Sequence, residues 1–94
     1  MKHYIIIKYN DKVTNREQFV QEVKQIFAPA LQIEGCSALN VYPSCSTRPN
    51  RHDLMIEMVL TPEALEIYDH SDFHQYWKQN YSQFIEHKTI FDCE

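Results

Sequence analysis

The sequence predicts an α+β fold, in which a four-stranded antiparallel sheet carries two helices on one face. Alternating apolar residues indicate short strands, and apolar residues three and four positions apart indicate helices. Strong helix-start signals separate the two kinds of segment. In chain order the segments read β-α-β-β-α-β. The 94 residues are expected to form one domain, residues 1–94, because domains cluster near about 100–150 residues.

Residues 3–9 are expected to form the first strand, since they alternate in polarity and are rich in β-branched isoleucine. Thr14 or Asn15 then caps a helix. Pro29 either ends this helix or kinks it, because proline lacks the N–H that continues a helix. The apolar stripe of the helix comprises Phe19, Val20, Val23, Ile26, Phe27, Ala30 and Leu31.

Gly35 is the only glycine, and it stands where the helix must give way to a second strand at residues 36–42. Glycine is favoured there because the left-handed backbone conformation costs it nothing. Residues 44–50 are polar and contain proline, which is typical of a loop. Residues 53–60 alternate most clearly and predict the third strand.

The second half of the chain begins with a strong helix start, in which Thr61 is the N-cap and Pro62 the first helical residue. Ser71 is a second N-cap that opens a further helical stretch. Its aromatic stripe, expected to pack in the core, comprises Phe73, Trp77, Tyr81 and Phe84. Residues 88–93 are the closing strand. This order of elements is the ferredoxin-like split β-α-β pattern.

The predicted sheet has a second face that no helix covers. It carries Tyr4, Ile6, Met55 and Val59 among polar residues. Such a face is too apolar to be left fully exposed to water, and packing two sheets face to face would cover it. We therefore expect a homodimer through the open sheet face.

Composition excludes several function classes. The net charge of −4 argues against nucleic acid and anionic membrane surfaces as partners, since both require a clustered basic surface. No apolar run approaches the length of a membrane span. The three cysteines share no CxxC spacing, which disfavours a zinc site or disulfide framework and predicts reduced thiols in the cytoplasm. A single glycine is too few for a phosphate-binding loop, so we expect no nucleotide cofactor.

Several motifs resemble the stress-responsive A/B-barrel domain (Dabb) family of the dimeric α/β-barrel superfamily. Ile33-Glu34-Gly35-Cys36 is similar to the Ile-Pro-Gly turn of that family, and Thr61-Pro62-Glu63-Ala64-Leu65 to its helix entry. Its most distinctive string, Tyr-x-x-His-Pro-x-His, corresponds to Tyr68-Asp69-His70-Ser71-Asp72-Phe73-His74. Ser71-Asp72 replaces His-Pro, although it can fill the same capping role. The resemblance implies a dimeric α/β barrel with a pocket between sheet and helices and without a cofactor.

Tyr68, His74 and His3 are the candidate catalytic residues. Six residues along a continuous helix would leave Tyr68 and His74 about 120° apart, but a break at Ser71 allows both to point into one space. There a tyrosine hydroxyl and an imidazole can act as acid and base. The resemblance implies this role, since a plant polyketide cyclase with the motif uses its Tyr and final His in proton transfer. The alternative is that all three residues only pack and hydrogen-bond.

The pocket is expected to be apolar and to bind a small hydrophobic molecule. Its predicted lining residues are Ile5, Ile7, Val23, Phe27 and Trp77. No metal site is expected, because two histidines lack a third ligand at suitable spacing. Three functions stay open: cofactor-free proton transfer of the cyclase or aldol type, a non-catalytic small-molecule-binding or stress-response module, and a cofactor-free monooxygenase.

Overall fold

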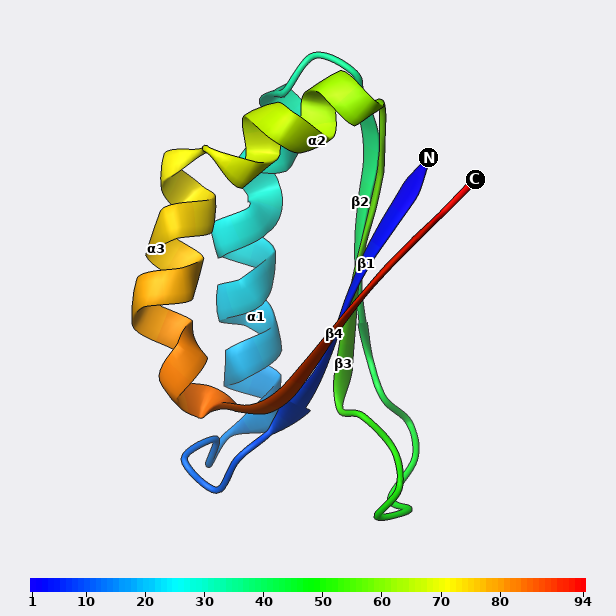
Figure 1. Ribbon diagram of the computed structural model, residues 1–94. Helices are drawn as coiled ribbons and strands as arrows, with labels where there is room; N and C mark the ends of the chain where they lie inside the picture. The colour runs from blue at the N-terminus through cyan, green and yellow to red at the C-terminus, as the bar shows by residue number, and fades with distance from the viewer.

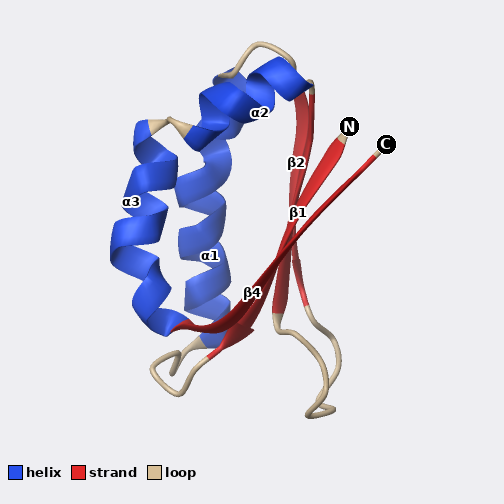
Figure 2. Cartoon of the chain, viewed as in Figure 1, coloured by secondary structure: helices blue, strands red, loops and turns tan.

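A four-stranded antiparallel sheet and one layer of helices make up the computed structural model, which describes residues 1–94 (Figures 1 and 2). The strands are β1 (Lys2–Tyr9), β2 (Cys36–Pro43), β3 (Leu54–Leu60) and β4 (Ile85–Cys93), in the spatial order β2-β3-β1-β4. The α-helices are α1 (Arg16–Phe27), α2 (Pro62–Asp69) and α3 (Asp72–Tyr81), and two short 3₁₀ helices, η1 (Ala28–Gln32) and η2 (Ser82–Phe84), follow α1 and α3. The ferredoxin-like fold is confirmed, with its second helical segment divided into α2 and α3.

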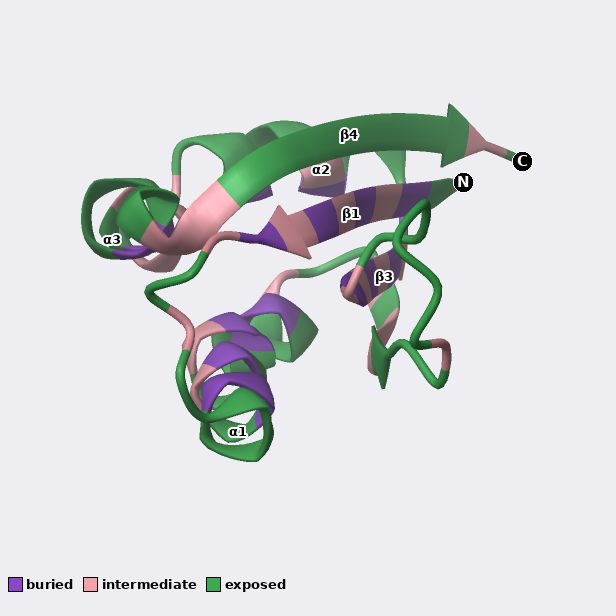
Figure 3. Ribbon diagram, turned by 90° about the horizontal axis from the view of Figure 1, so that it is seen from below, coloured by how far each residue is buried: buried purple, intermediate pink, exposed green.

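The central strands β1 and β3 alternate between a buried and a partly exposed side (Figure 3). His3, Ile5 and Ile7 face the helices, whereas Tyr4 and Ile6 face the open side of the sheet. The register pairs β1 with β3 and β4 on its two sides, so all three strands contribute to both faces. The strand β4 is longer than predicted, because it begins directly after η2 rather than at residue 88.

The first helix begins at Asn15, whose side chain accepts a hydrogen bond from the Gln18 amide at 3.0 Å. This decides between the two predicted caps. The α-helix ends at Phe27, and Pro29 lies within η1. The prediction that Leu31 belongs to the buried stripe is wrong, since it is 50% exposed. A 3₁₀ helix turns about 120° per residue instead of about 100°, so Ala30 stays buried while Leu31 turns out of the α-helical stripe.

Gly35 adopts a φ of +93°, as the sequence predicts for the reversal before β2. A Cβ at this position would lie 2.6 Å from the hydroxyl oxygen of Thr61. That hydroxyl caps α2 by accepting a hydrogen bond from the Ala64 amide at 3.1 Å, and the Thr61 amide donates to the Gly35 carbonyl at 3.0 Å. Glycine at position 35 therefore allows the start of α2 to dock against the turn that precedes β2.

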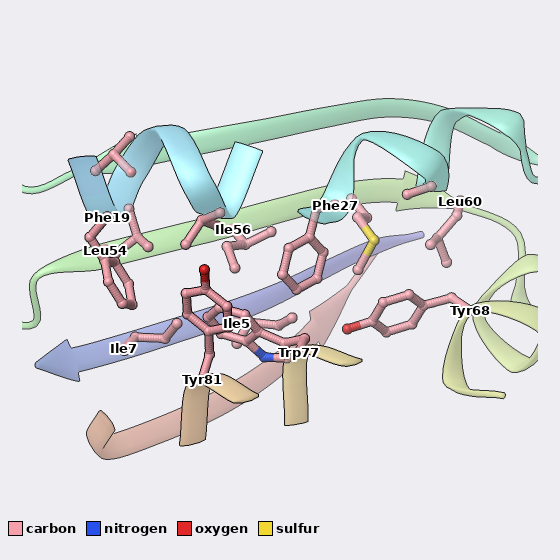
Figure 4. Packing of buried hydrophobic residues seen from close by; sticks show 14 of the residues in the cluster. Ile5, Ile7, Phe19, Phe27, Leu54, Ile56, Leu60, Tyr68, Trp77 and Tyr81 are labelled. Carbon is pink, nitrogen blue, oxygen red and sulfur yellow. The ribbon is translucent and has the colours of Figure 1, made fainter. Parts of the chain in front are cut away.

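Aromatic side chains fill the space between the helices and the sheet (Figure 4). Phe27 lies among three of them, with ring centroids 6.2 Å from Tyr68, 6.1 Å from Phe73 and 5.1 Å from Trp77. Trp77 and Tyr81 are buried, which confirms the core role predicted for the aromatic stripe. This packing fixes α3 against α1 and so positions the side chains on the other side of α3. None of the helices is both long enough and apolar enough to cross a membrane.

Candidate functional site

A cavity of about 340 Å³ lies between the sheet edge formed by β1 and β4 and the helices α2 and α3. Five of its eleven lining residues are apolar or aromatic: Ile5, Leu65, Tyr68, Trp77 and Ile90. The other six are ionisable: His3, Asp69, His74, Lys78, Lys88 and Asp92. The cavity brings together the three candidate catalytic residues, but the prediction of an apolar pocket is wrong. Its wall is about half charged or polar because β1, α2, α3 and β4 each contribute at least one ionisable side chain.

Tyr68 and His74 lie in contact, with ring centroids 4.3 Å apart and planes inclined by 31°. Tyr68 is near the end of α2 and His74 is in the first turn of α3. Between them, the Ser71 hydroxyl donates a hydrogen bond to the Tyr68 carbonyl at 2.6 Å and accepts one from the His74 amide at 3.2 Å. The break at Ser71 therefore juxtaposes two rings that a continuous helix would separate.

The imidazole of His74 has a defined orientation. Its Nδ1 lies 3.0 Å from the Asp69 carbonyl oxygen, and a carbonyl can only accept, so Nδ1 carries the hydrogen. In the neutral ring Nε2 is then unprotonated. Burial lowers the pKa of His74, and the positive charges of Lys78 and Lys88 lower it further, against the opposing effects of the Asp69 carbonyl and carboxylate. His74 is therefore a free base near neutral pH.

The hydroxyl of Tyr68 is buried and makes no hydrogen bond within the protein. The residue is only 1% exposed, and its side chain points from α2 into the interior (Figure 4). Burial raises the pKa of Tyr68 well above its ordinary value, with the Asp69 carboxylate adding to the effect. The phenol therefore stays protonated and is a hydrogen-bond donor without a partner. Most buried polar groups in proteins are paired, so this exception requires an explanation.

His3 and Asp92 stand opposite each other on β1 and β4. The His3 Nδ1 and an Asp92 carboxylate oxygen are 2.5 Å apart. Because the carboxylate accepts this bond, it orients the His3 ring and places the hydrogen on Nδ1. His3 is 7% exposed, and its ring centroid lies 5.9 Å from that of Tyr68. The sequence thus places His3 in the right cavity, but it does not identify its partner Asp92.

Only part of the predicted pocket lining reaches this cavity. Ile5 and Trp77 line it, as expected. Ile7, Val23 and Phe27 do not, because all three are completely buried in the packed core. Val23 and Phe27 lie on α1, whose apolar face packs directly against the other core side chains and leaves no space. The prediction of these three as lining residues is therefore wrong.

Four polar lining residues were not predicted: Asp69, Lys78, Lys88 and Asp92. Three of them have a recognisable sequence signal. Lys78 follows His74 by four residues and so shares its helix face. Lys88 and Asp92 lie two residues on either side of Ile90 on β4, which gives all three the same face of the sheet. No group of three or more His, Cys, Asp or Glu side chains is arranged to hold a metal ion.

Comparisons with known proteins give matches in structure but not in sequence. No family model matches the chain, and no curated protein matches it in sequence. A dimeric protein of unknown function with a ferredoxin-like fold from Bacteroides fragilis superposes with a TM-score of 0.80 at 14% identity, over 99% of this chain and 93% of that one. A Dabb family protein with a ferredoxin-like fold from Mesorhizobium loti superposes with a TM-score of 0.77 at 13% identity, over 99% of this chain and 93% of that one.

A third similar structure is a protein of unknown function from Bacteroides thetaiotaomicron, described as a possible oxidoreductase. It gives a TM-score of 0.70 at 22% identity and covers 98% of this chain and 95% of that one. These similarities show that the chain has the ferredoxin-like α+β fold. The resemblance to the Dabb family seen in the motifs is thus confirmed in the fold, since a protein of that family is among the structural neighbours.

Proposed function

We propose that the cavity binds a small organic molecule and catalyses proton transfer on it without a cofactor. His74 is the base, Tyr68 is the acidic hydrogen-bond donor, and His3, oriented by Asp92, supports the site. The observation that carries the proposal is the buried hydroxyl of Tyr68, which has no partner in the protein, on a ring that contacts an imidazole with a free Nε2. A ligand carbonyl oxygen would be a suitable acceptor for this hydroxyl.

The arrangement suits enolisation followed by ring closure. His74 Nε2 removes a proton from a carbon next to a carbonyl group, and the electron pair of that C–H bond moves to the carbonyl oxygen. The Tyr68 hydroxyl donates a hydrogen bond to the resulting enolate oxygen, which stabilises its charge. The enolate carbon can then attack a second carbonyl of the same molecule, and the protonated His74 returns its proton to the new alkoxide. The reaction is a cyclisation of the aldol type, and no oxidant is consumed.

The test is deuterium exchange from heavy water into 2-tetralone, a small aromatic ketone with acidic C–H bonds, followed by NMR. The wild-type protein should accelerate exchange above the buffer rate. His74→Asn retains a donor for the Asp69 carbonyl but removes the base, so it should lower the rate by about 100-fold or more. His70→Asn is the matched control, because His70 makes a similar bond to the Glu66 carbonyl outside this cavity. Equal rates for the two variants would refute the proposal.

Two other functions would use the same cavity. A non-catalytic binding or stress-response module would show ligand-induced thermal stabilisation without deuterium exchange. A cofactor-free monooxygenase is favoured by the description of the Bacteroides thetaiotaomicron neighbour as a possible oxidoreductase. It would consume oxygen in the presence of a quinol, whereas a proton-transfer enzyme would not.

We also propose that two copies of the chain pair through the open face of the sheet. This face exposes large apolar side chains, including Phe91 at 56% and Tyr42 at 46%. At its centre, the Glu57 carboxylate already accepts hydrogen bonds from Tyr4 at 2.7 Å and Asn40 at 2.9 Å. A partner can therefore cover this carboxylate without leaving it unpaired. The structural neighbour from Bacteroides fragilis is described as dimeric, which supports the proposal.

Light scattering coupled to size exclusion tests the pairing. The wild-type protein should have twice the mass of one chain, and Phe91→Asp should reduce it to a monomer, because a charge would be buried in the interface. Ile67→Asp is the matched control, since Ile67 is 54% exposed but lies on α2, away from the open face. A monomeric wild-type protein would rule out the dimer.

The reduced state expected for the three cysteines leads us to propose a cytoplasmic location. None of them is in a disulfide, and Cys45 is exposed. Thiol labelling of protein taken directly from its host cells tests this. All three should react after denaturation without prior reduction, and recovery of a disulfide-linked form would refute it.

A further inference from the structure

Two lysines face the cavity from opposite walls. Lys78 projects from α3 and Lys88 from β4. Neither ammonium group lies within 4.0 Å of a carboxylate, because the only ion pairs in the protein are His3–Asp92 and Arg16–Asp53. Both charges act on His74, whose pKa they lower. The cavity therefore contains two cations that form no ion pair with the protein.

The acidic groups of the cavity belong to its other end. Asp92 is bonded to His3, and it is four residues from Lys88 along β4, which is roughly 13 Å in an extended strand. Asp69 directly follows Tyr68, and its carbonyl holds His74. Lys78 is one helical turn beyond His74, or about 6 Å along the axis of α3. The cavity thus has an acid–base end and a cationic end, and Ile90 lies between Lys88 and Asp92 on its β4 wall.

We propose that this cavity selects anionic ligands, specifically small aromatic carboxylic acids whose carboxylate lies between Lys78 and Lys88. The ring would pack against the apolar middle of the cavity. The position of the reacting end rests on the proposed function. The acidic C–H of the ligand would lie at His74, roughly one ring length from the carboxylate. The ligand is therefore amphipathic rather than purely hydrophobic.

The test compares 2-naphthoate with 2-naphthamide, which have nearly the same shape but differ by one negative charge. Binding is measured by NMR titration of the wild-type protein and of single variants. Lys78→Met and Lys88→Met retain the aliphatic stem and remove the charge. Lys12→Met is the matched control, since Lys12 is an exposed lysine outside the cavity. All three sites are exposed, and a thermal melt verifies that each variant is folded.

The wild-type protein should bind naphthoate at least about 5-fold more tightly than naphthamide. Each cavity variant should weaken naphthoate binding about 3- to 10-fold and leave naphthamide within about 2-fold, whereas Lys12→Met changes neither. Raising the sodium chloride concentration from about 50 to about 500 mM should weaken the binding of naphthoate but not that of naphthamide. Equal binding of acid and amide, binding of neither, or equal loss of both in the cavity variants would overturn the proposal.

This experiment needs no turnover, so its failure is distinct from failure of the proposed function. If Lys78→Met loses the preference for naphthoate but the wild-type protein does not exchange 2-tetralone, the anion site is supported and the proposed catalysis is refuted. Exchange that depends on His74, with equal binding of naphthoate and naphthamide, would refute the anion site alone.

Discussion

Replacing Tyr68 by phenylalanine should stabilise the protein, because the change removes an unpaired polar group from the buried core. The hydroxyl is buried without a hydrogen-bond partner, and the residue is 1% exposed. Burying an unpaired hydroxyl costs about 1–3 kcal/mol relative to water. The variant recovers that cost and leaves a gap of one oxygen atom. We expect the free energy of unfolding to rise by about 1 kcal/mol, which is a Tm increase of roughly 4–8 °C for a domain of this size.

The assay is urea unfolding followed by the fluorescence of Trp77, the only tryptophan, whose ring centroid lies 5.1 Å from that of Phe27 in the core. Tyr81→Phe is the matched control. Tyr81 is 8% exposed, but its hydroxyl donates a hydrogen bond to the Glu22 carboxylate at 2.5 Å. Loss of that bond should lower the free energy of unfolding by about 1 kcal/mol. The same chemical change should thus have opposite signs at Tyr68 and Tyr81.

A loss of stability in Tyr68→Phe equal to that in Tyr81→Phe would refute the reasoning, because it would show that the Tyr68 hydroxyl has a partner. If stability rises while exchange on 2-tetralone falls by about 10-fold or more, the hydroxyl is retained at the expense of stability. Such a trade-off is typical of active sites, where a polar group is prepared for a ligand rather than for its own protein.

Three further predictions follow from the same geometry. Gly35→Ala should lower the free energy of unfolding by about 2 kcal/mol or more in urea titrations, since the new Cβ would be strained at φ +93° and would displace the Thr61 cap. The pKa of His74 is lower in the folded protein than its ordinary value of 6.5, so as the pH falls the unfolded chain binds a proton before the folded protein does. The free energy of unfolding should therefore be constant above about pH 6.5 and decrease below it. The fall should be smaller in His74→Asn, and an unchanged pH profile would contradict the pKa shift. Asp92→Asn should slow exchange on 2-tetralone several-fold because His3 loses its charged partner, and an unchanged rate would remove His3 from the site.

The fold could be predicted from the sequence because its signals are local. Strand alternation, the caps at Asn15, Thr61 and Ser71, and the lone Gly35 each depend on a few neighbouring residues. The error at Leu31 arose because the chain passes from an α-helix to a 3₁₀ helix after Phe27, which changes the spacing of buried residues. The pattern of apolar residues alone does not mark this change. The early start of β4 has a related cause, because η2 passes directly into the strand at Ile85 with no connecting loop.

The site was predicted less well because its composition depends on pairing between distant segments. Tyr68, His74 and His3 were identified from a motif and from one strand face. Asp92 is chosen as the partner of His3 by the register of β1 with β4, and a sequence does not give that register directly. The error at Val23 and Phe27 has the related cause that a buried helix face does not show whether it borders a cavity or a closed core.

The substitution of Ser71-Asp72 for the His-Pro pair of the resembling family shows which part of the motif the geometry needs. The turn between α2 and α3 requires a cap that can bond both helices, and the Ser71 hydroxyl bonds the Tyr68 carbonyl and the His74 amide at once. Asp72 opens α3 with a negative charge at its N-terminus, where the helix dipole favours it. In this chain Ser71-Asp72 makes the break and keeps the six-residue spacing of the motif, with five residues between Tyr68 and His74. The juxtaposition of Tyr68 and His74, with ring centroids 4.3 Å apart, depends on the turn rather than on the identity of the residues that form it.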